Sequence, residues 1–180
     1  YNKSMKKRIG IIIFARTNSL RLPNKVFLEI KNKKILEHII DRFLKKKILK
    51  NIIIATSKKN SDKKIIQFCK KKNIKFFAGS NKDVAKRTID CCKKFKLTHF
   101  MRICGDRLFF DTNVAIRMLK YFIKDNKYNI YTNYLSKNFP RGQICEIVDY
   151  KIFSNSYKKF NKKDKEHILN YFYRNKKNLK

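Results

Sequence analysis

Short apolar runs alternate with longer amphipathic segments along most of the chain of 180 residues. Residues 9–15 form a β-branched apolar run followed by a polar loop, the pattern of a strand buried on both faces. Apolar residues at positions 35, 36, 39, 40, 43 and 44 recur at helical spacing and predict an amphipathic helix over residues 34–47. The alternation continues with predicted strands at 51–56, 74–77, 100–103, 129–134 and 144–150, and with predicted helices from near 61, over 83–95, over 112–124 and over 164–175.

This alternation predicts the fold class. Strands separated by helix-length segments imply crossover connections, and hence a largely parallel sheet covered by helices on both faces. We therefore predict an α/β protein with three layers. No linker or repeat divides the chain, so residues 1–180 are predicted to form a single domain. At the start of the second predicted helix, the Ser61 hydroxyl and the Asp62 carboxylate suit a first helical turn.

The composition is that of a folding chain with an unusual charge. Hydrophobic residues make up 43% of it, with 15 Phe and 9 Tyr, which is enough to bury a core. The formal net charge of +34 suggests a partner rich in phosphate, such as a nucleic acid. The Lys residues are spread along the whole chain among Asn and Ile, however, which favours an ordinary solvated surface. Nucleic acid therefore stays the weaker interpretation.

Neither the cysteines nor the apolar runs indicate an extracellular or membrane protein. No apolar run approaches the 18 residues that a membrane helix needs, and the N-terminus lacks a secretory pattern. We expect a cytoplasmic protein with no membrane partner. The chain begins with Tyr1, so a fragment is one expectation. Five cysteines without a C-x-x-C pair are predicted to be reduced core thiols, namely Cys69, Cys91, Cys92, Cys104 and Cys145.

The loop after the first predicted strand carries the first candidate chemistry. In open α/β sheets, ligands bind at the carboxyl ends of the strands. This loop holds Arg16, Ser19, Arg21 and Lys25, with Pro23 stiffening it. Guanidinium groups bind phosphate oxygens bidentately, and Arg is scarce among the 47 cationic residues. The loop therefore suits a nucleoside triphosphate, although a Lys-rich chain places cations in many loops. There is no G-x-x-x-x-G-K-[ST] motif, which excludes a P-loop ATPase.

A carboxylate follows the fourth predicted strand. Gly105 lets the backbone turn there, and Asp106 comes directly after it. Mg²⁺ prefers one or two protein oxygens together with phosphate and water, so Asp106 is the metal candidate. The alternative is an ordinary turn or helix-cap Asp.

The combination resembles a known family. The segment A-R-T-N-S-L-R-L-P-N-K, residues 15–25, is similar to the A-R-x-x-S-x-R-L-P-x-K signature of cytidylyltransferases of the spore-coat polysaccharide type. These are relatives of the synthetases that make CMP-sialic acid and CMP-Kdo. Further matches follow in the family's order along nearly the whole chain, at residues 55–57, 79–80, 83–84, 87, 102–103, 105–106, 139–142, 146 and 166–167.

The resemblance implies a Rossmann-like nucleotide-diphospho-sugar transferase fold and a CTP-dependent reaction. A sugar or sugar-acid hydroxyl would attack the α-phosphate, CMP-sugar would form for surface polysaccharide or glycan synthesis, and pyrophosphate would leave. Family roles then pass to matching positions. Arg16, Arg21 and Lys25 would hold the triphosphate with Ala15 and help from Ser19, and Asp106 would bind Mg²⁺. Near the base and ribose would lie Thr56, Ser57, Ser80 and Arg87, whereas Arg141 and Glu146 would face the acceptor or the metal.

For some residues the sequence does not decide between a role in binding and a structural role. Ser57 and Ser80 are equally well explained as turn hydroxyls. His167 lies on a family motif, while His38 and His99 are expected to be structural. A homodimer is one expectation, since relatives commonly pair through their C-terminal part.

The sequence also departs from the family pattern. Phe14 replaces the family's Gln, Asn24 replaces a Gly, and Ile144 replaces an Asp. The family's last segment, with another metal-side Asp, is expected to be missing after Lys180, which would weaken activity. A non-catalytic nucleotide-binding module therefore remains an alternative to an enzyme. A glycosyltransferase is less favoured because the chain has no Asp-x-Asp motif.

Overall fold

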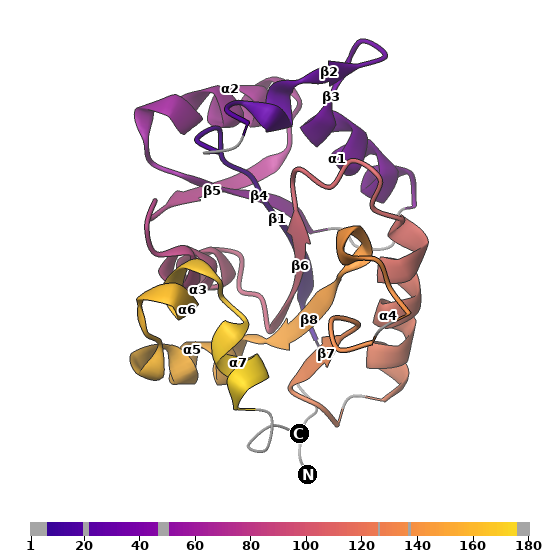
Figure 1. The fold of residues 1–180 in the computed structure, drawn as a ribbon, viewed down its shortest axis with the longest axis vertical. Coiled ribbons are helices and arrows are strands. Elements are labelled where there is room, and N and C mark those ends of the chain that lie inside the picture. The colour runs from indigo at the N-terminus through magenta and orange to yellow at the C-terminus, as the bar shows by residue number, and fades with distance from the viewer. Residues whose placement is uncertain (1–6, 20–21, 47–50, 126, 137, 176–180) are drawn as a thin grey trace.

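The computed structural model describes residues 7–19, 22–46, 51–125, 127–136 and 138–175, and its centre is one six-stranded sheet (Figure 1). The strand order is β5-β4-β1-β6-β8-β7. The four strands β5, β4, β1 and β6 are parallel, whereas β8 runs antiparallel to both of its neighbours. The strands are β1 (Ile9–Phe14), β4 (Ile52–Ser57), β5 (Lys75–Gly79), β6 (His99–Cys104), β7 (Ile130–Thr132) and β8 (Glu146–Asp149).

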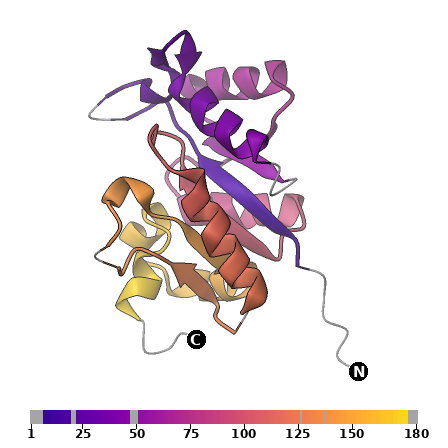
Figure 2. The same ribbon diagram turned by 90° about the vertical axis from the view of Figure 1, so that its right-hand side faces the viewer.

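Helices cover both faces of this sheet, which confirms the three-layer α/β prediction. One face is covered by α1 (Ile35–Lys45), α2 (Lys63–Lys71) and α4 (Thr112–Lys124). The other face is covered by α3 (Val84–Lys94), α5 (Tyr150–Ser156), α6 (Lys162–Glu166) and α7 (Asn170–Arg174). Figure 2 shows α4 lying across one side of the sheet.

Alternation along the central strand explains the two cores. Ile11 and Ile13 of β1 belong to the core under α1, α2 and α4. Ile12, which points to the opposite face, belongs to the core under α3 and the C-terminal helices. Both sets are almost fully buried, as a continuous apolar run predicts for a strand between two helical layers.

The C-terminal part differs from the prediction. Residues 164–175 were expected to form one helix, but α6 ends at Glu166 and α7 begins at Asn170. His167 leaves the helical conformation, with φ −108° and ψ 79°. The turn between the helices buries Ile168 and Leu169 in the core, so an apparently continuous helical pattern conceals a break. The helix α5 was not predicted either.

A small hairpin before α1 was also missed. It consists of β2 (Glu29–Ile30) and β3 (Lys33–Lys34), joined by Lys31 and Asn32, both with positive φ. Its two-residue strands are too short to show the alternation of apolar and polar residues that identifies a strand. His38 supports the hairpin, since its Nε2 lies 2.7 Å from the carbonyl oxygen of Ile30. This contact confirms a structural position for His38.

The start of the second predicted helix is corrected by the structure. A 3₁₀ turn at Asn60–Asp62 precedes α2, and no side chain caps either element. The carboxylate of Asp62 instead turns into the protein, where it accepts hydrogen bonds from Thr17 and Ser57.

The cysteines are free, as predicted. Four of them are buried, and only Cys104 is half-buried. Burial raises the pKa of the Cys69 and Cys91 thiols to about 12, so both are protonated core residues. Among the described residues, every helix is too short or too polar to cross a membrane.

Candidate active site

A cavity of about 310 Å³ lies where β1 and β6 end, with its walls completed by α3 and by the end of α6. This is the sheet edge at which α/β proteins bind ligands. Five residues assigned from the sequence line it, namely Ala15, Arg16, Lys25, Arg87 and Asp106. The other lining residues are Phe14, Val26, Val84, Arg102, Cys104, Glu166, His167 and Ile168.

Lys25 and Asp106 form an ion pair on the wall of this cavity. Lys25 begins the 3₁₀ helix after the first loop, whereas Asp106 follows β6, so residues far apart in sequence meet here. Gly105 makes the meeting possible. A Cβ atom at this position would lie 2.9 Å from the Phe14 carbonyl oxygen, closer than real side chains approach. The pair thus joins the predicted phosphate-binding loop to the predicted metal ligand.

The loop between β1 and Lys25 folds back on one carbonyl group. The Thr17 carbonyl oxygen accepts hydrogen bonds from the amides of Ser19, at 3.0 Å, and Asn24, at 2.8 Å. Asn24 adopts a left-handed conformation with φ 55°. Asn tolerates this conformation better than most residues other than Gly, so it can stand where the family has Gly. Arg21 lies outside the described residues, so its predicted role stays a prediction.

Arg16 lies on the exposed side of the loop. Its Nη1 is 3.9 Å from Oε1 of Glu166, and both side chains are about half exposed. Such a pair contributes little stability, so Arg16 can leave Glu166 at little cost and bind a more highly charged anion. Through this contact the end of α6 lies next to the loop, and both contribute to the cavity wall.

Arg87 reaches the cavity from α3 although it is buried. Its side chain lies on Gly79, where a Cβ atom would be 2.8 Å from the Arg87 Cγ. Nη1 donates to the Ser80 carbonyl oxygen at 3.2 Å, and Nε has no hydrogen-bond partner among the described residues. Burial lowers the pKa of Arg87 to about 10, although the charge of Asp62 opposes this change. Arg87 therefore stays cationic at neutral pH and has an unused donor.

The predicted hydroxyl residues lie around the cavity rather than on its walls. Ser19, Thr56 and Ser57 are buried, and Ser57 donates to Asp62. The Thr56 hydroxyl is buried without a partner among the described residues. The Ser80 hydroxyl accepts from the Asp83 amide at 3.0 Å, as a turn residue does. Their predicted contact with a nucleotide stays a prediction.

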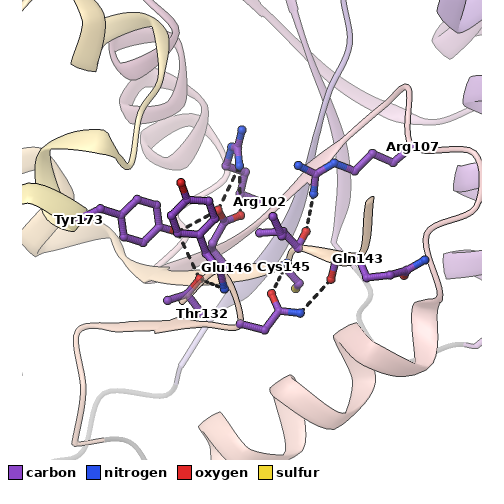
Figure 3. Close-up of polar contacts among 10 residues, drawn as sticks. Arg102, Arg107, Thr132, Gln143, Cys145, Glu146 and Tyr173 are labelled. Atoms are coloured by element: carbon purple, nitrogen blue, oxygen red, sulfur yellow. Dashed lines mark hydrogen bonds and ion pairs between the residues drawn. The ribbon is translucent and has the colours of Figure 1, made fainter. Parts of the chain in front are cut away.

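Glu146 lies behind the cavity in a buried network with Arg102 and Tyr173 (Figure 3). Arg102 Nη1 is 3.1 Å from both carboxylate oxygens of Glu146. Tyr173, on α7, donates its hydroxyl to Oε1 at 3.0 Å. Burial would lower the pKa of Arg102, but the charge of Glu146 and the hydrogen bond to its carboxylate help to raise it. Glu146 itself does not line the cavity but contacts Arg102, which does, so its predicted place beside the acceptor or the metal stays a prediction.

The segment before β8 contains the remaining predicted residue and one departure. Arg141 begins a 3₁₀ helix, but its side chain lies outside the described part of the chain. Ile144, which replaces an acidic family residue, is buried, and its carbonyl accepts from Arg107 Nη1 at 2.6 Å. Gln143 and Cys145, its neighbours in the sequence, are shown in Figure 3. An apolar side chain here supplies no ligand for a metal or sugar.

The lining residues with polar or sulfur-containing side chains that had no role assigned from the sequence are Arg102, Cys104, Glu166 and His167. Arg102 and Cys104 are spaced by two along β6, and Asp106 continues the same spacing after the strand. Alternate residues of a strand share one face, so this spacing could have indicated Arg102 as a cavity residue. His99, at the other end of β6, packs against Phe122 as a structural residue.

A protein-family model described as cytidylyltransferase matches residues 10–179. The chain is 33% identical over 170 residues to an uncharacterized protein, MJ1063, of Methanocaldococcus jannaschii, covering 94% of this chain and 68% of that one. The structure is similar to that of a cytidylyltransferase from Leptospira borgpetersenii, with a TM-score of 0.91, 27% identity, and coverage of 96% of this chain and 74% of the other.

A more distant likeness is to a CMP:2-keto-3-deoxy-manno-octonic acid synthetase, whose structure was solved with CTP. The TM-score is 0.65 at 15% identity, with 86% of this chain and 79% of that chain covered. At this identity the likeness concerns the fold, and it confirms the mostly parallel Rossmann-like architecture.

Proposed function

Because the chain belongs to the cytidylyltransferase family, whose members are nucleotidyltransferases, we propose that it transfers CMP from CTP to a hydroxyl of a sugar or sugar acid. The observation that carries the proposal is the Lys25–Asp106 pair on the wall of the cavity. It places a cation and a carboxylate where the phosphate-binding loop meets the end of β6. A polyphosphate is bound by cations, and its metal ion is bound by a carboxylate, so the two charges are needed side by side.

The cations around the cavity suit a triphosphate. Arg16 and Lys25 line it from the two ends of the first loop and Arg87 lines it from α3, so they can contact different phosphates. In the proposed reaction, the acceptor hydroxyl oxygen bonds to the α-phosphorus of CTP. The bond from that phosphorus to the pyrophosphate oxygen breaks, and the hydroxyl proton passes to water. Lys25 and Arg16 would stabilise the negative charge that collects on pyrophosphate.

Mg²⁺ is the cofactor that the family resemblance implies, and the residues of the cavity fit it. The Asp106 carboxylate is partly exposed and lies beside cations that suit phosphate groups. The described residues contain no cluster of three or more side chains that could hold a metal. This donor set suits an ion held by one carboxylate and by substrate phosphates, the usual arrangement for Mg²⁺. We propose Asp106 as its protein ligand; when bound, the ion would neutralise charge on the phosphates.

The acceptor would enter on the side formed by Arg102 and the end of α6. Arg102 uses Nη1 for Glu146, and its guanidinium has further donors for an acceptor's hydroxyl or carboxylate group. We propose a sugar or sugar acid destined for a surface polysaccharide or glycan, on the resemblance of residues 15–25 to the spore-coat type of the family. On the same resemblance we propose that Arg141 contacts the acceptor.

The decisive experiment measures pyrophosphate release. The protein is incubated with Mg²⁺, one nucleoside triphosphate at a time, and a panel of neutral sugars and sugar acids. We expect release with CTP and one acceptor class, and loss of release in Arg16→Ala and Asp106→Asn. Arg117→Ala is the matched control, because Arg117 is an exposed arginine on α4 outside the cavity, and it should keep full activity.

Other results would replace the proposal. CTP binding without release under any acceptor would indicate a non-catalytic nucleotide-binding module. Equal binding of all four triphosphates, together with salt-sensitive binding of an unrelated RNA, would indicate a nucleic-acid protein instead.

A further inference from the structure

We infer that Asp62 is a positioning residue that fixes the phosphate-binding loop through Thr17. This inference rests on the proposed function, because the loop matters only if it binds CTP. Asp62 lies outside the cavity and outside the motifs that resemble the family. Its contacts reach the cavity through the loop, and its charge also acts on the cavity residue Arg87.

The contacts of Asp62 join segments that are distant in sequence. Its Oδ1 accepts from the Thr17 amide at 2.7 Å and from the Thr17 hydroxyl at 2.8 Å. Its Oδ2 accepts from the hydroxyl of Ser57, at the end of β4. Two atoms of one loop residue are thus held by a carboxylate 45 positions further along the chain.

Thr17 passes this restraint on to Arg16 and Lys25, the two cations of the loop that line the cavity. Its carbonyl oxygen accepts from the Asn24 amide at 2.8 Å, which closes the loop. Asn24 directly precedes Lys25, and Arg16 directly precedes Thr17. Fixing Thr17 therefore fixes the backbone next to each of these cavity-lining side chains.

Burial of the carboxylate indicates that the arrangement is rigid. Asp62 is 1% exposed, and among the described residues it forms no ion pair with a Lys or Arg. A buried carboxylate without an ion-pair partner is costly, so it depends on its hydrogen-bond donors. Burial alone would raise the pKa of Asp62, but the donors Ser57 and Thr17 outweigh it and lower the pKa. The carboxylate is thus held ionised by the very groups that it positions.

The expected consequence is on substrate binding. A loop that is already in its bound shape spends less binding free energy on becoming ordered when the ligand arrives. Loosening the loop should therefore raise the KM for CTP while leaving kcat nearly unchanged. A role confined to stability would change neither constant in the protein that remains folded.

The test compares the same substitution at two hydroxyls, one in the loop after β1 and one, directly before β6, that contacts the chain before β1. Thr17→Val removes the hydroxyl that donates to Asp62 while keeping the side-chain shape. Thr98→Val removes a hydroxyl that holds the chain before β1, where Thr98 Oγ1 accepts from the Arg8 amide at 2.8 Å. Loss of one charge-assisted hydrogen bond should raise the KM for CTP about tenfold in Thr17→Val. Thr98→Val should keep the wild-type KM, and Thr17→Ser should restore it.

Hydrogen exchange of the protein without nucleotide gives a second readout. The amides of Thr17, Ser19 and Asn24 should exchange faster in Thr17→Val and in Asp62→Asn than in wild type or Thr98→Val. If wild type uses CTP but Thr17→Val keeps both its KM and its amide protection, the inference about Asp62 is overturned and the proposed function stands. If wild type does not use CTP, the proposed function fails, and unchanged amide protection would independently overturn the restraint.

Discussion

Arg102 and Glu146 lie directly opposite each other on the antiparallel strands β6 and β8, and one guanidinium nitrogen contacts both oxygens of the carboxylate. Only Arg102 reaches the cavity, while Glu146 is buried behind it. Tyr173 of α7 completes the network by donating to Glu146. Residues of β8 and α7 therefore hold Arg102 at the cavity wall together.

Glu146→Gln should destabilise the protein by about 3 kcal/mol, because it leaves Arg102 without its buried counter-charge. Tyr173→Phe removes a single hydrogen bond from the same carboxylate and should cost only about 1 kcal/mol. Urea unfolding followed by circular dichroism measures both values. Equal losses in the two variants would mean that the charge of Glu146 adds nothing beyond one hydrogen bond.

Lys25→Met and Asp106→Asn should each reduce kcat about 100-fold or more, since the proposed function places these charges beside the reacting phosphates and their metal ion. Their free energy of unfolding should change by less than about 1 kcal/mol, because ion pairs with such partial exposure contribute little. Asp106→Asn should also raise the Mg²⁺ concentration needed for half-maximal activity. Lys33→Met is the control, because it breaks the exposed Lys33–Asp41 pair at 2.8 Å, outside the cavity, and should keep kcat.

Gly79→Ala should weaken CTP binding by displacing Arg87. The added Cβ would lie 2.8 Å from the Arg87 Cγ and 2.8 Å from Phe77 Cε1, so the arginine must move. Gly10→Ala is an equally crowded control at the start of β1, where a Cβ would meet a Leu97 methyl at 2.6 Å. Both variants should lose about 1–3 kcal/mol of stability. Only Gly79→Ala should raise the dissociation constant for CTP in calorimetry; an equal effect of Gly10→Ala would contradict the role of Arg87.

Most of the fold could be predicted because its strands are long and apolar. The run before Ala15 has buried residues on both faces, and that pattern is typical of a central strand in a sheet between two layers of helices. The hairpin at Lys31 and Asn32 could not be predicted, since its turn contains no Gly and its strands have two residues each. The break near His167 was missed because the core takes up Ile168 and Leu169 at a turn rather than along a helix.

The candidate site was predicted in part, for a different reason. Motif residues in one loop and after one strand could be placed together because parallel strands end at the same edge of a sheet. The direction of a side chain at a turn is not encoded in the same way. Asp62 has the sequence features of a helix start, yet its carboxylate points inward to Thr17. Only tertiary contacts distinguish these two uses of an Asp.

His99 gives a pH dependence that is separate from the candidate site. Its ring lies 4.9 Å from that of Phe122, and its Nε2 is 3.4 Å from Oδ2 of Asp149. Burial lowers the pKa of His99 below its ordinary value of 6.5, although the charge of Asp149 opposes this change. The unfolded chain therefore takes up a proton at a higher pH than the folded protein does, and the free energy of unfolding should fall as the pH drops below about 6.5. His99→Phe removes this titration and should lose less stability than wild type between pH 7 and pH 5.5. Urea unfolding at both pH values measures the difference, and parallel losses in the two proteins would assign the pH dependence to other groups.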